Sequence, residues 1–314
     1  MNTFGRLFRV SIFGESHGDG VGIVIDGCPA GLDISKDDFA KDLERRKGGS
    51  RNTTARKEAD IPMIKSGVFN GKSTGAPIMI FFENKEVDSS DYERIKNTPR
   101  PGHADLVAMQ KFKGFNDYRG GGHFSGRLTV ALVAAGVIAK KILNNVKIKA
   151  ELMGQEIEEL EGDSIGGIVE CIVTGLPVGL GEPFFDSAES LLSHAAFSIP
   201  AIKGIEFGAG FACAKMRGSE FSDEIIDIKG TTKTNNAGGI NGGITNGNEL
   251  VFRVAVKPAS SINKPMNTVD VKTKEQVSLE TRGRHDACIA LRVPVVLEAI
   301  TAIVLADLML IDQR

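Results

Sequence analysis

The chain of 314 residues is poor in several residue types that mark particular classes of protein. It has no tryptophan, two tyrosines and four cysteines. The cysteines lie too far apart for a C-x-x-C metal or dithiol motif. The net charge of -2 is unlike that of a basic nucleic-acid-binding protein, and 41% hydrophobic residues is ordinary for a globular domain. We expect reduced, mostly buried thiols, no metal site and no nucleic-acid partner; the cysteines are Cys28, Cys171, Cys213 and Cys288.

The sequence also has little that would direct the protein to a membrane. Residues 1–9 contain no apolar run of the kind that a secretory signal needs, so we expect a cytoplasmic protein. The most apolar stretch, 293–311, is nearly long enough to cross a bilayer, but it contains Glu298 and Asp307 and has no basic or aromatic flanks. Pro294 suits the first turn of a helix. We therefore expect a buried core helix and no membrane partner.

Hydrophobic patterns predict both strands and helices in each half of the chain. Alternation or β-branched runs predict strands at 8–12, 21–26, 168–173 and 250–256, and a strand, turn and strand at 68–82. Helices are predicted at 36–46, 105–113, 128–143 and 187–197. No Pro- or Ser-rich linker separates the halves. We expect an α/β fold in one compact domain, 1–314, compatible with an internal duplication.

Two glycine-rich segments imitate nucleotide-binding motifs. Residues 70–73, Asn-Gly-Lys-Ser, resemble the end of a P-loop, but Ser66 stands where the leading glycine is required. Residues 208–214 match a dinucleotide-binding pattern loosely, without a clear βαβ unit around them. We interpret neither as a nucleotide site.

Three other segments combine a histidine with tight-turn residues. Imidazole titrates near neutrality, and glycine lets backbone and ligand approach closely, so these are candidate catalytic turns. In the last segment, Asp286 beside Arg284 also fits an ordinary surface ion pair. His194 lies outside any cluster and is expected to be structural. The segments are Gly-Glu-Ser-His-Gly (14–18), Arg-Pro-Gly-His-Ala-Asp (100–105) and Gly-Arg-His-Asp (283–286).

Several segments could bind an anion. Residues 117–127 run through three glycines into a predicted buried helix, where free backbone amides and the helix dipole favour phosphate. Arginines and lysine cluster at 45–56, although these cations also suit a helix C-terminus. Residues 235–247 are small and polar, and fit either a surface loop or amides that touch a flat ring or phosphate. Lys257 follows a strand, with two serines after it.

In order and together, these segments resemble the chorismate synthase family over essentially the whole chain. Gly-Asp-Ser-Ile-Gly at 162–166 and Asn-Asn-Ala-Gly-Gly at 235–239 extend the match. The resemblance implies a β-α-β sandwich and the 1,4-anti elimination of phosphate from 5-enolpyruvylshikimate 3-phosphate, giving chorismate, with reduced FMN and no net redox change. This is the last common step of aromatic amino acid (shikimate) biosynthesis. It also implies a homotetramer. The reduced FMN would come from a separate flavin reductase or, in a bifunctional enzyme, from reduction of FMN by NADPH on the protein itself.

The resemblance also implies roles for individual residues. His17 would protonate the reduced flavin, His103 would lie by the departing phosphate, and Asp286 would help to deprotonate flavin N5. Forked cations suit a substrate with a phosphate and two carboxylates. The substrate-binding candidates are Arg46, Arg51, Arg100, Arg127 and Arg284; Arg46 and Arg51 would also bind NADPH in a bifunctional enzyme. The FMN-binding candidates are His123, Phe124, Ser125, Ala201, Gly242, Lys257, Pro258, Ala259, Ser260, Ser261 and Arg284.

The chain departs from the common family pattern in two places that bear on the flavin. Residues 123–128 read His-Phe-Ser-Gly-Arg-Leu where many members read Arg-Ser-Ser-Ala-Arg-Glu, and Pro200 stands where asparagine is common. One alternative is therefore a flavin-binding variant whose altered 123–128 loop impairs turnover. Another is a non-catalytic module that binds polyanions through its arginines, against which the acidic net charge counts.

Overall fold

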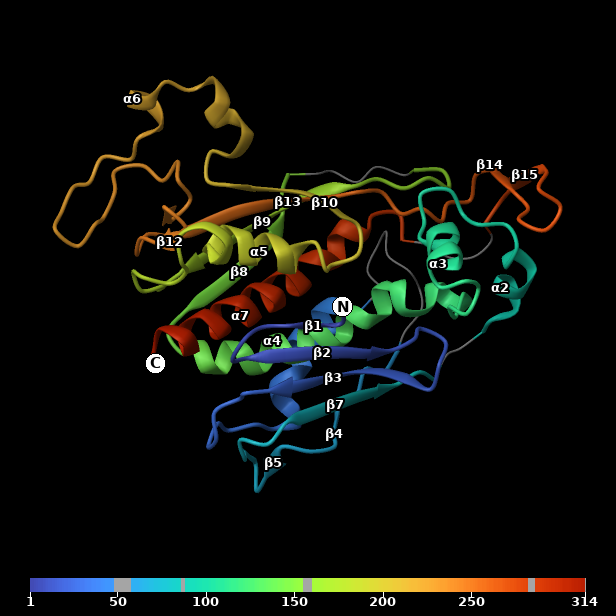
Figure 1. Ribbon diagram of the computed structural model, residues 1–314, viewed down its shortest axis with the longest axis horizontal. Coiled ribbons are helices and arrows are strands. Elements are labelled where there is room, and N and C mark those ends of the chain that lie inside the picture. Colours follow the sequence, from blue (N-terminus) through green and yellow to red (C-terminus); the bar gives the residue numbers. More distant parts are fainter. Residues whose placement is uncertain (48–57, 86–87, 155–159, 282–285, 314) are drawn as a thin grey trace.

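Two antiparallel β-sheets lie on either side of a layer of helices (Figure 1). The computed structural model describes residues 1–47, 58–85, 88–154, 160–281 and 286–313. The first sheet has the strand order β1 (Thr3–Phe4), β2 (Arg9–Gly14), β3 (Gly20–Asp26), β7 (Ile78–Glu83) and β4 (Met63–Ile64). The second has the order β10 (Ile202–Phe207), β13 (Leu250–Val256), β9 (Gly167–Thr174) and β8 (Lys147–Leu152).

The two longest helices pack against each other between the sheets. These are α4 (Thr129–Leu143) and α7 (Val293–Asp312), with α1 (Ala40–Arg46) and α5 (Ala188–Ala196) beside them. At their crossing, a Cβ on Gly136 would lie 2.4 Å from the Cβ of Ala299. Only glycine allows this approach of the two helix backbones.

The apolar residues of both sheets and both long helices form one continuous buried cluster. In β3, the alternate residues Val21, Ile23 and Ile25 are fully buried, as are Leu250, Phe252 and Val254 in β13. Helix α7 is long and apolar enough to cross a membrane, but most of its residues are buried inside the protein. It is the core helix that the sequence predicts.

The N-terminal segment is fastened to α7 by a buried carboxylate. Asp307 is 3% exposed, and it accepts hydrogen bonds from the backbone amides of Arg6, Leu7 and Phe8 at 2.6 to 3.0 Å. Three amides on one carboxylate satisfy a charge that would otherwise be costly to bury. This contact joins residues about 300 positions apart in the sequence.

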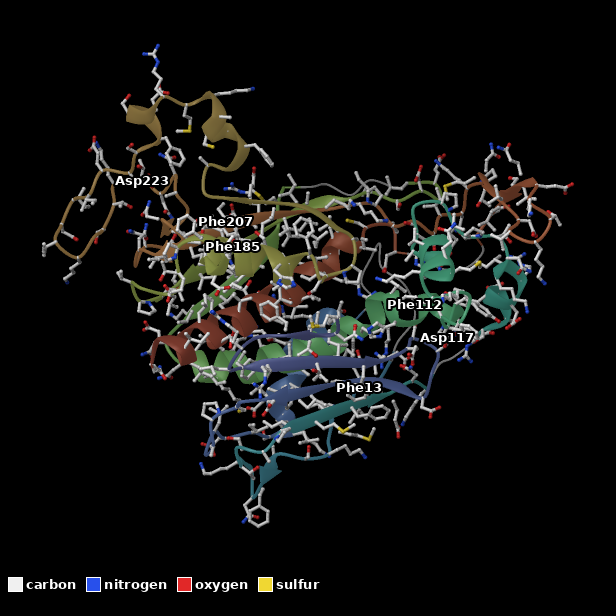
Figure 2. The ribbon with its side chains drawn as sticks, in the orientation of Figure 1. Phe13, Phe112, Asp117, Phe185, Phe207 and Asp223 are labelled. Carbon is white, nitrogen blue, oxygen red and sulfur yellow. The ribbon has the colours of Figure 1, made fainter. Side chains whose placement is uncertain are left out.

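Shorter elements lie at the periphery. Two lie near the 100–105 turn, α2 (Ser90–Ile95) and α3 (Asp105–Lys111), and a hairpin of β14 (Met266–Val269) and β15 (Gln276–Leu279) lies beyond them. An arm at 208–249 projects from the second sheet and contains α6 (Gly218–Phe221), β11 (Ile240–Asn241) and β12 (Ile244–Thr245) (Figure 1). Asp223, labelled in Figure 2, ties this arm together by accepting from Thr234, Asn236 and Ala237. The short 3-10 segments are Lys36–Phe39, Arg119–Phe124, Gly126–Leu128, Phe184–Asp186, Gly210–Lys215 and Ile289–Arg292.

The layered architecture confirms the predicted fold class. Each half of the chain supplies one sheet and one long helix, as an internal duplication would; the single domain over 1–314 stays a prediction. The predicted strands and helices are present, with shifts of at most two residues at their ends, and the first four residues of the predicted helix 36–46 form a 3-10 turn. The 68–82 prediction needs correction, because a tight turn at Asn70 (φ 47°) and Gly71 (φ 74°) pairs β5 (Val68–Phe69) with β6 (Lys72–Ser73) before β7 begins. The residues directly after Lys72 lead into strand β7 and not into a helix, which excludes the P-loop interpretation.

Candidate functional site

One large cavity, of about 1070 Å³, gathers most of the predicted site residues. Leu132 of α4 and Val296, Ile300 and Ile303 of α7 form part of its apolar wall. Charged and polar side chains from turns and helix ends line the rest. Its volume is at the upper end of the range for small-molecule sites, enough for a cofactor and a substrate together.

The predicted residues divide into three groups by position. Pro258 does not line this cavity, and neither does Gly242, which lies in the turn between β11 and β12. Arg51 and Arg284 lie outside the described residues. The predicted residues that line the cavity are His17, Arg46, Arg100, His103, His123, Phe124, Ser125, Arg127, Ala201, Lys257, Ala259, Ser260, Ser261 and Asp286.

His17 lies in the turn between β2 and β3 and packs against the glycine triplet. The residue is 7% exposed; its Nδ1 is 2.9 Å from Ser89 Oγ, and its ring meets the edge of Tyr92. A Cβ on Gly120, which has a φ of +59°, would come within 2.3 Å of the His17 ring. Both the backbone angle and the close contact therefore require glycine here.

The glycine triplet replaces a regular helix start with a tightly wound turn. All three glycines have positive φ values, and the amide of Ser16 donates to the carbonyl of Gly122 at 3.1 Å. On the far side of the triplet, a Cβ on Gly121 would lie 3.4 Å from the ring of His103. The triplet thus separates the two predicted catalytic histidines while bringing both to one cavity.

His103 shares its turn with an arginine and an aspartate. Asp105 accepts from His103 Nδ1 at 2.5 Å, and from Arg100 Nε at 2.8 Å and Nη2 at 2.9 Å. Burial alone would raise the pKa of Asp105, but hydrogen bonds from Arg100 and His103 hold it well below its ordinary value. Arg100 also donates to Ser261 Oγ at 3.0 Å, so most of its fork is used within the protein.

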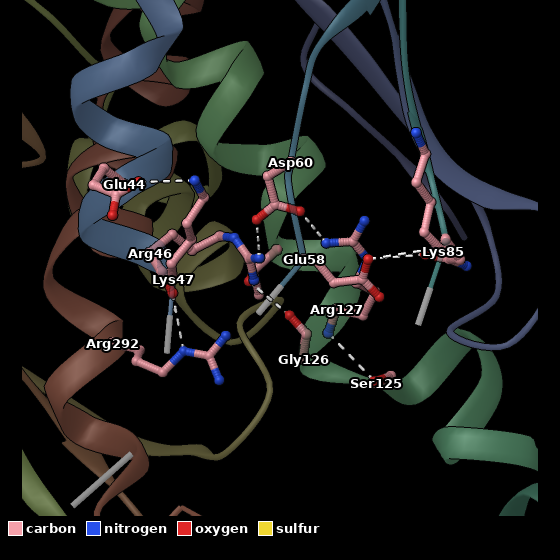
Figure 3. Close-up of polar contacts among 12 residues, drawn as sticks. Glu44, Arg46, Lys47, Glu58, Asp60, Lys85, Ser125, Gly126, Arg127 and Arg292 are labelled. Carbon is pink, nitrogen blue, oxygen red and sulfur yellow. Dashed lines mark hydrogen bonds and ion pairs between the residues drawn. The ribbon is translucent and has the colours of Figure 1, made fainter. Parts of the chain in front are cut away.

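A buried aspartate joins two of the predicted substrate-binding arginines (Figure 3). The side chain of Asp60 is completely buried and accepts from Arg46 Nη2 and Arg127 Nη1. Burial would raise the pKa of Asp60, but the two guanidinium groups outweigh it and lower this pKa. The same burial, with Arg292 and Arg127 nearby, lowers the pKa of Arg46 to about 10, so Arg46 remains charged at neutral pH.

The two arginines differ in how many of their donors the protein uses. Arg127 also donates from Nε to Asn84 Oδ1 at 3.0 Å and from Nη2 to the Glu83 carbonyl at 3.3 Å. Arg46 is 3% exposed, yet its Nε has no hydrogen-bond partner among the described residues. Ser16 Oγ, in the same cavity, is also buried without one among them. Buried polar groups left without partners are costly, so these two atoms are the ones that a ligand or a water in the cavity would satisfy.

Asp286 is held near Arg46 by Arg292. Arg292 donates from Nη1 to Asp286 Oδ2 at 3.2 Å and from Nε to the Arg46 carbonyl at 2.9 Å. Asp286 thus has an ion-pair partner at the start of α7 that the sequence did not indicate. A carboxylate in this position can accept a proton from a group in the cavity.

The loop 257–261 closes the cavity from the second sheet. β13 ends at Val256, and Lys257 Nζ donates to Ser260 Oγ, which in turn donates to the Gly102 carbonyl at 2.7 Å. Burial and the nearby Lys203 lower the pKa of Lys257. The Lys257 amide donates to the carbonyl of Ala201, whose φ of 77° is unusual for a residue with a Cβ. This loop therefore docks directly on the His103 turn.

The altered 123–128 segment is built into the cavity wall. His123 Nδ1 is 2.8 Å from the Gly14 carbonyl, and its Nε2 is 3.2 Å from Asn2 Oδ1. Phe124 is 40% exposed and packs against Phe112. Ser125 Oγ accepts from the Arg127 amide and so caps the following turn. Both ring nitrogens of His123 have protein partners, which leaves its backbone and ring face for a ligand.

Sequence reasoning missed several residues that shape the site. Asp60 and Asn84 orient arginines, Ser89 and Tyr92 contact His17, and Arg292 holds Asp286. The only sequence signal for Asp60 is its position shortly after the arginine-rich loop. Within the described parts of the chain, no group of three or more histidine, cysteine or acidic side chains could hold a metal ion. The absence of a metal site stays a prediction.

Comparisons with known proteins agree on one family. The family model for chorismate synthase matches residues 8–161 and 149–310. A chorismate synthase of Chitinophaga pinensis is 62% identical over 325 residues, which cover 100% of this chain and 98% of that protein. One from Dehalococcoides mccartyi is 48% identical, covering 98% and 96% respectively. A crystal structure of a chorismate synthase superposes with a TM-score of 0.73 at 28% identity, over 98% of this chain and 93% of the other.

Proposed function

The chain belongs to the chorismate synthase family, whose members are lyases, and from this membership we propose that it converts 5-enolpyruvylshikimate 3-phosphate to chorismate and phosphate. The reaction is a 1,4-anti elimination that requires reduced FMN and completes the common part of aromatic amino acid biosynthesis. The observation that carries the proposal is the buried cation Arg46, whose Nε has no partner among the described residues and which lines the large cavity.

Arg46 and Arg127 are the cations best placed to bind the anionic groups of the substrate. Asp60 neutralises one of their two charges, and the cavity around them excludes most water, so a bound anion would be held strongly. Arg100 is more fully occupied by Asp105 and Ser261, and its contribution would come mainly through its charge.

The cavity also fits a reduced flavin. Its volume accommodates a ring system beside the substrate, and the side chains of α4 and α7 offer an apolar surface for the ring. His123, Phe124, Ser125, Ala201 and the loop 257–261 would hold the cofactor, with Lys257 as the cation for its phosphate. Bound reduced FMN would lend electron density to the elimination and recover it afterwards.

Three residues would handle protons around the substrate. His103 would donate a proton to the departing phosphate, and His17 would hold a proton at the face of the cavity beside Gly120. Asp286, held by Arg292, would help to deprotonate the flavin at N5, so that the proton leaving the substrate's C6 has an acceptor. The C6–H and C–O bonds break, a C=C bond forms, and the proton and phosphate leave.

We propose a cytoplasmic homotetramer as its form. Support for association comes from large apolar side chains that are exposed in this single chain. Phe184, Phe185 (Figure 2) and Phe211 are 87%, 93% and 81% exposed, on or near the projecting arm. Burying such side chains against another copy would be favourable.

The function is tested by incubating the protein with substrate and chemically reduced FMN under anaerobic conditions. We expect stoichiometric chorismate and inorganic phosphate, and neither product with oxidised FMN. If flavin and substrate bind but no phosphate is released, the variant with the altered 123–128 loop is the better description. Turnover with NADPH and oxidised FMN would show that the protein reduces its own flavin; otherwise a separate reductase must supply it.

A further inference from the structure

The turn that carries His103 also carries a carboxylate aimed at its imidazole. We propose that Asp105 is a positioning residue for His103: it fixes the ring through Nδ1 and stabilises the protonated imidazole, so that Nε2 is the atom that acts on the leaving group. The proposal rests on the proposed function only for the identity of that leaving group, a phosphate.

The position of Asp105 is fixed by several hydrogen bonds at once. Its Oδ2 accepts from the Arg100 amide at 3.1 Å and from Arg100 Nε at 2.8 Å, while Oδ1 accepts from Arg100 Nη2 at 2.9 Å. The remaining contact of Oδ1 is His103 Nδ1 at 2.5 Å. The carboxylate therefore cannot turn away from the imidazole without losing bonds to Arg100, and it holds one orientation of the ring.

This geometry assigns the protons of His103. An ionised carboxylate only accepts hydrogen bonds, so Nδ1 carries a hydrogen in both charge states of the ring. The exchangeable proton is then the one on Nε2. That edge of the ring faces the glycine triplet, because a Cβ on Gly121 would lie 3.4 Å from Cε1 and 3.5 Å from Nε2. An aspartate behind the histidine of a catalytic triad has the same two effects, on tautomer and on charge.

The charges around His103 make Asp105 necessary for a protonated ring. Arg100 Nη2 lies 3.1 Å from Nδ1, and a guanidinium so close disfavours a second positive charge. Asp105 contacts both groups and offsets one of the two positive charges. Two other titratable groups lie near this turn: Lys257 is linked to it through Ser260, and His17 lies beyond the glycine triplet. The remaining titratable side chains that line the cavity are Arg46, Lys47, Glu58, Asp60, Asp88, Asp91, Tyr92, Arg94, His123, Arg127, His194, Asp286 and Arg292.

Replacing Asp105 by asparagine keeps the shape and removes the charge. We expect Asp105→Asn to lower kcat by about 10²- to 10⁴-fold, the range for losing acid-base catalysis, while KM changes less than about threefold. Because the protonated ring is disfavoured in the variant, its activity should decline with rising pH at a lower pH than in the wild type. Asp105→Glu, which restores the charge on a longer arm, should recover part of the loss.

Glu170→Gln is a matched control that lies outside the site. Glu170 of β9 is paired with Arg253 Nε and Nη2 at 2.8 and 2.7 Å, and its side chain is 23% exposed against 19% for Asp105, but neither Glu170 nor Arg253 lines the cavity. We expect its kcat to stay within about threefold of the wild type. A similar loss in both variants would overturn the proposal, because it would mark a structural role.

Two further measurements separate this proposal from its alternatives. In the double variant His103→Ala/Asp105→Asn, kcat should be no lower than in His103→Ala alone, since residues that act as one unit are not additive. Additive losses, or a rise in KM with unchanged kcat, would overturn it. NMR titration of labelled His103 needs no turnover: its midpoint should move to lower pH in Asp105→Asn, even if the wild type releases no phosphate, and an unmoved midpoint contradicts the proposal.

Discussion

Arg45 and Arg46 are neighbours at the end of α1, and the structure uses them in opposite ways. Arg45 donates from both Nη atoms to Glu298 of α7 at 2.7 Å each, and its side chain is 39% exposed. Arg46 is buried, and Asp60 is the carboxylate that its side chain contacts among the described residues. The pKa of Arg45 is raised, chiefly by the hydrogen bond to Glu298, whereas burial lowers the pKa of Arg46 to about 10.

The ion-pair site around Glu298 and the one around Asp60 differ in whether all of their buried polar groups have partners. Glu298 is also bound by Lys140 at 3.1 Å and by the Ala150 amide at 3.1 Å, so that site satisfies its carboxylate and joins α7 to α1, α4 and β8. The Asp60 site leaves a buried Nε of Arg46 without an acceptor among the described residues. A closed network of buried charges stabilises the fold, and an incomplete one at a cavity indicates a ligand.

Replacing Arg46, the arginine with the unpartnered Nε, should have the largest effect on activity. We expect Arg46→Met to lower kcat/KM by about 30- to 1000-fold, which corresponds to about 2–4 kcal/mol for a charged contact to a buried anion. Direct titration with substrate and oxidised FMN, where no turnover occurs, should show the same loss in Kd.

The matched control is its neighbour. Arg45→Met should leave kcat/KM within about threefold of the wild type and lower the midpoint of urea unfolding instead. The comparison would be broken by the reverse result, in which Arg45→Met loses activity and Arg46→Met does not.

Removing the charge of Glu298, at the centre of the fully paired network, should lower the stability of the fold. Glu298→Gln removes the charge that Arg45 and Lys140 share, and we expect it to lower the free energy of unfolding by about 2 kcal/mol, reduced from the value for fully buried pairs because both cations reach solvent. Urea unfolding at neutral pH measures this loss, and kcat/KM should be unchanged. A stable but inactive variant would contradict the structural role of this network.

The pH dependence of the same variant sharpens the test. Burial would raise the pKa of Glu298, but Arg45, Lys140 and the Ala150 amide outweigh it and hold this pKa below its ordinary value of 4.5. A lowered carboxyl pKa stabilises the fold at pH values above the ordinary one, and that contribution disappears as the pH falls through the lowered value. The stability difference between wild type and Glu298→Gln should therefore shrink as the pH falls below the ordinary value of 4.5.

The smallest effect is expected from a surface cation that belongs to neither site. Lys72 pairs with Asp33 at 2.7 Å, but their side chains are 56% and 80% exposed. Lys72→Ala should leave both kcat/KM and the unfolding midpoint within experimental error, since exposed ion pairs contribute little. A loss of activity would contradict the placement of Lys72 on the surface, outside both sites.

Strong periodic patterns predicted the central elements of the fold correctly. The apolar segments of α4 and α7, and the alternating strands β2 and β13, have patterns that only one environment satisfies. β8, β10 and the β14–β15 hairpin were missed, because short strands with charged residues owe their pairing to neighbours in the sheet. The two-residue strands of β5 and β6 depend on turn geometry at Asn70.

Sequence motifs indicated the histidines, the arginines and Asp286 of the candidate site, but not the carboxylates that orient them. His17, His103 and Arg127 stand in recognisable motifs, and the structure places them around one cavity. Whether an aspartate such as Asp60 or Asp105 is exposed or buried between cations depends on segments far apart in the chain. No local pattern contains that information, so the residues that orient the arginines and histidines appear only in the folded structure.

The hydrogen bonds from Arg6, Leu7 and Phe8 to Asp307 determine when the cavity can be completed during synthesis of the chain. The ribosome makes the N-terminal segment first, and about 300 further residues must follow before Asp307, whose carboxylate binds this segment, has been synthesised. Residues 1–4 contribute to the wall of the cavity. A nascent chain can therefore form its first sheet early, but its reaction chamber is completed only when α7 has docked, so premature termination within α7 yields a protein without a finished chamber.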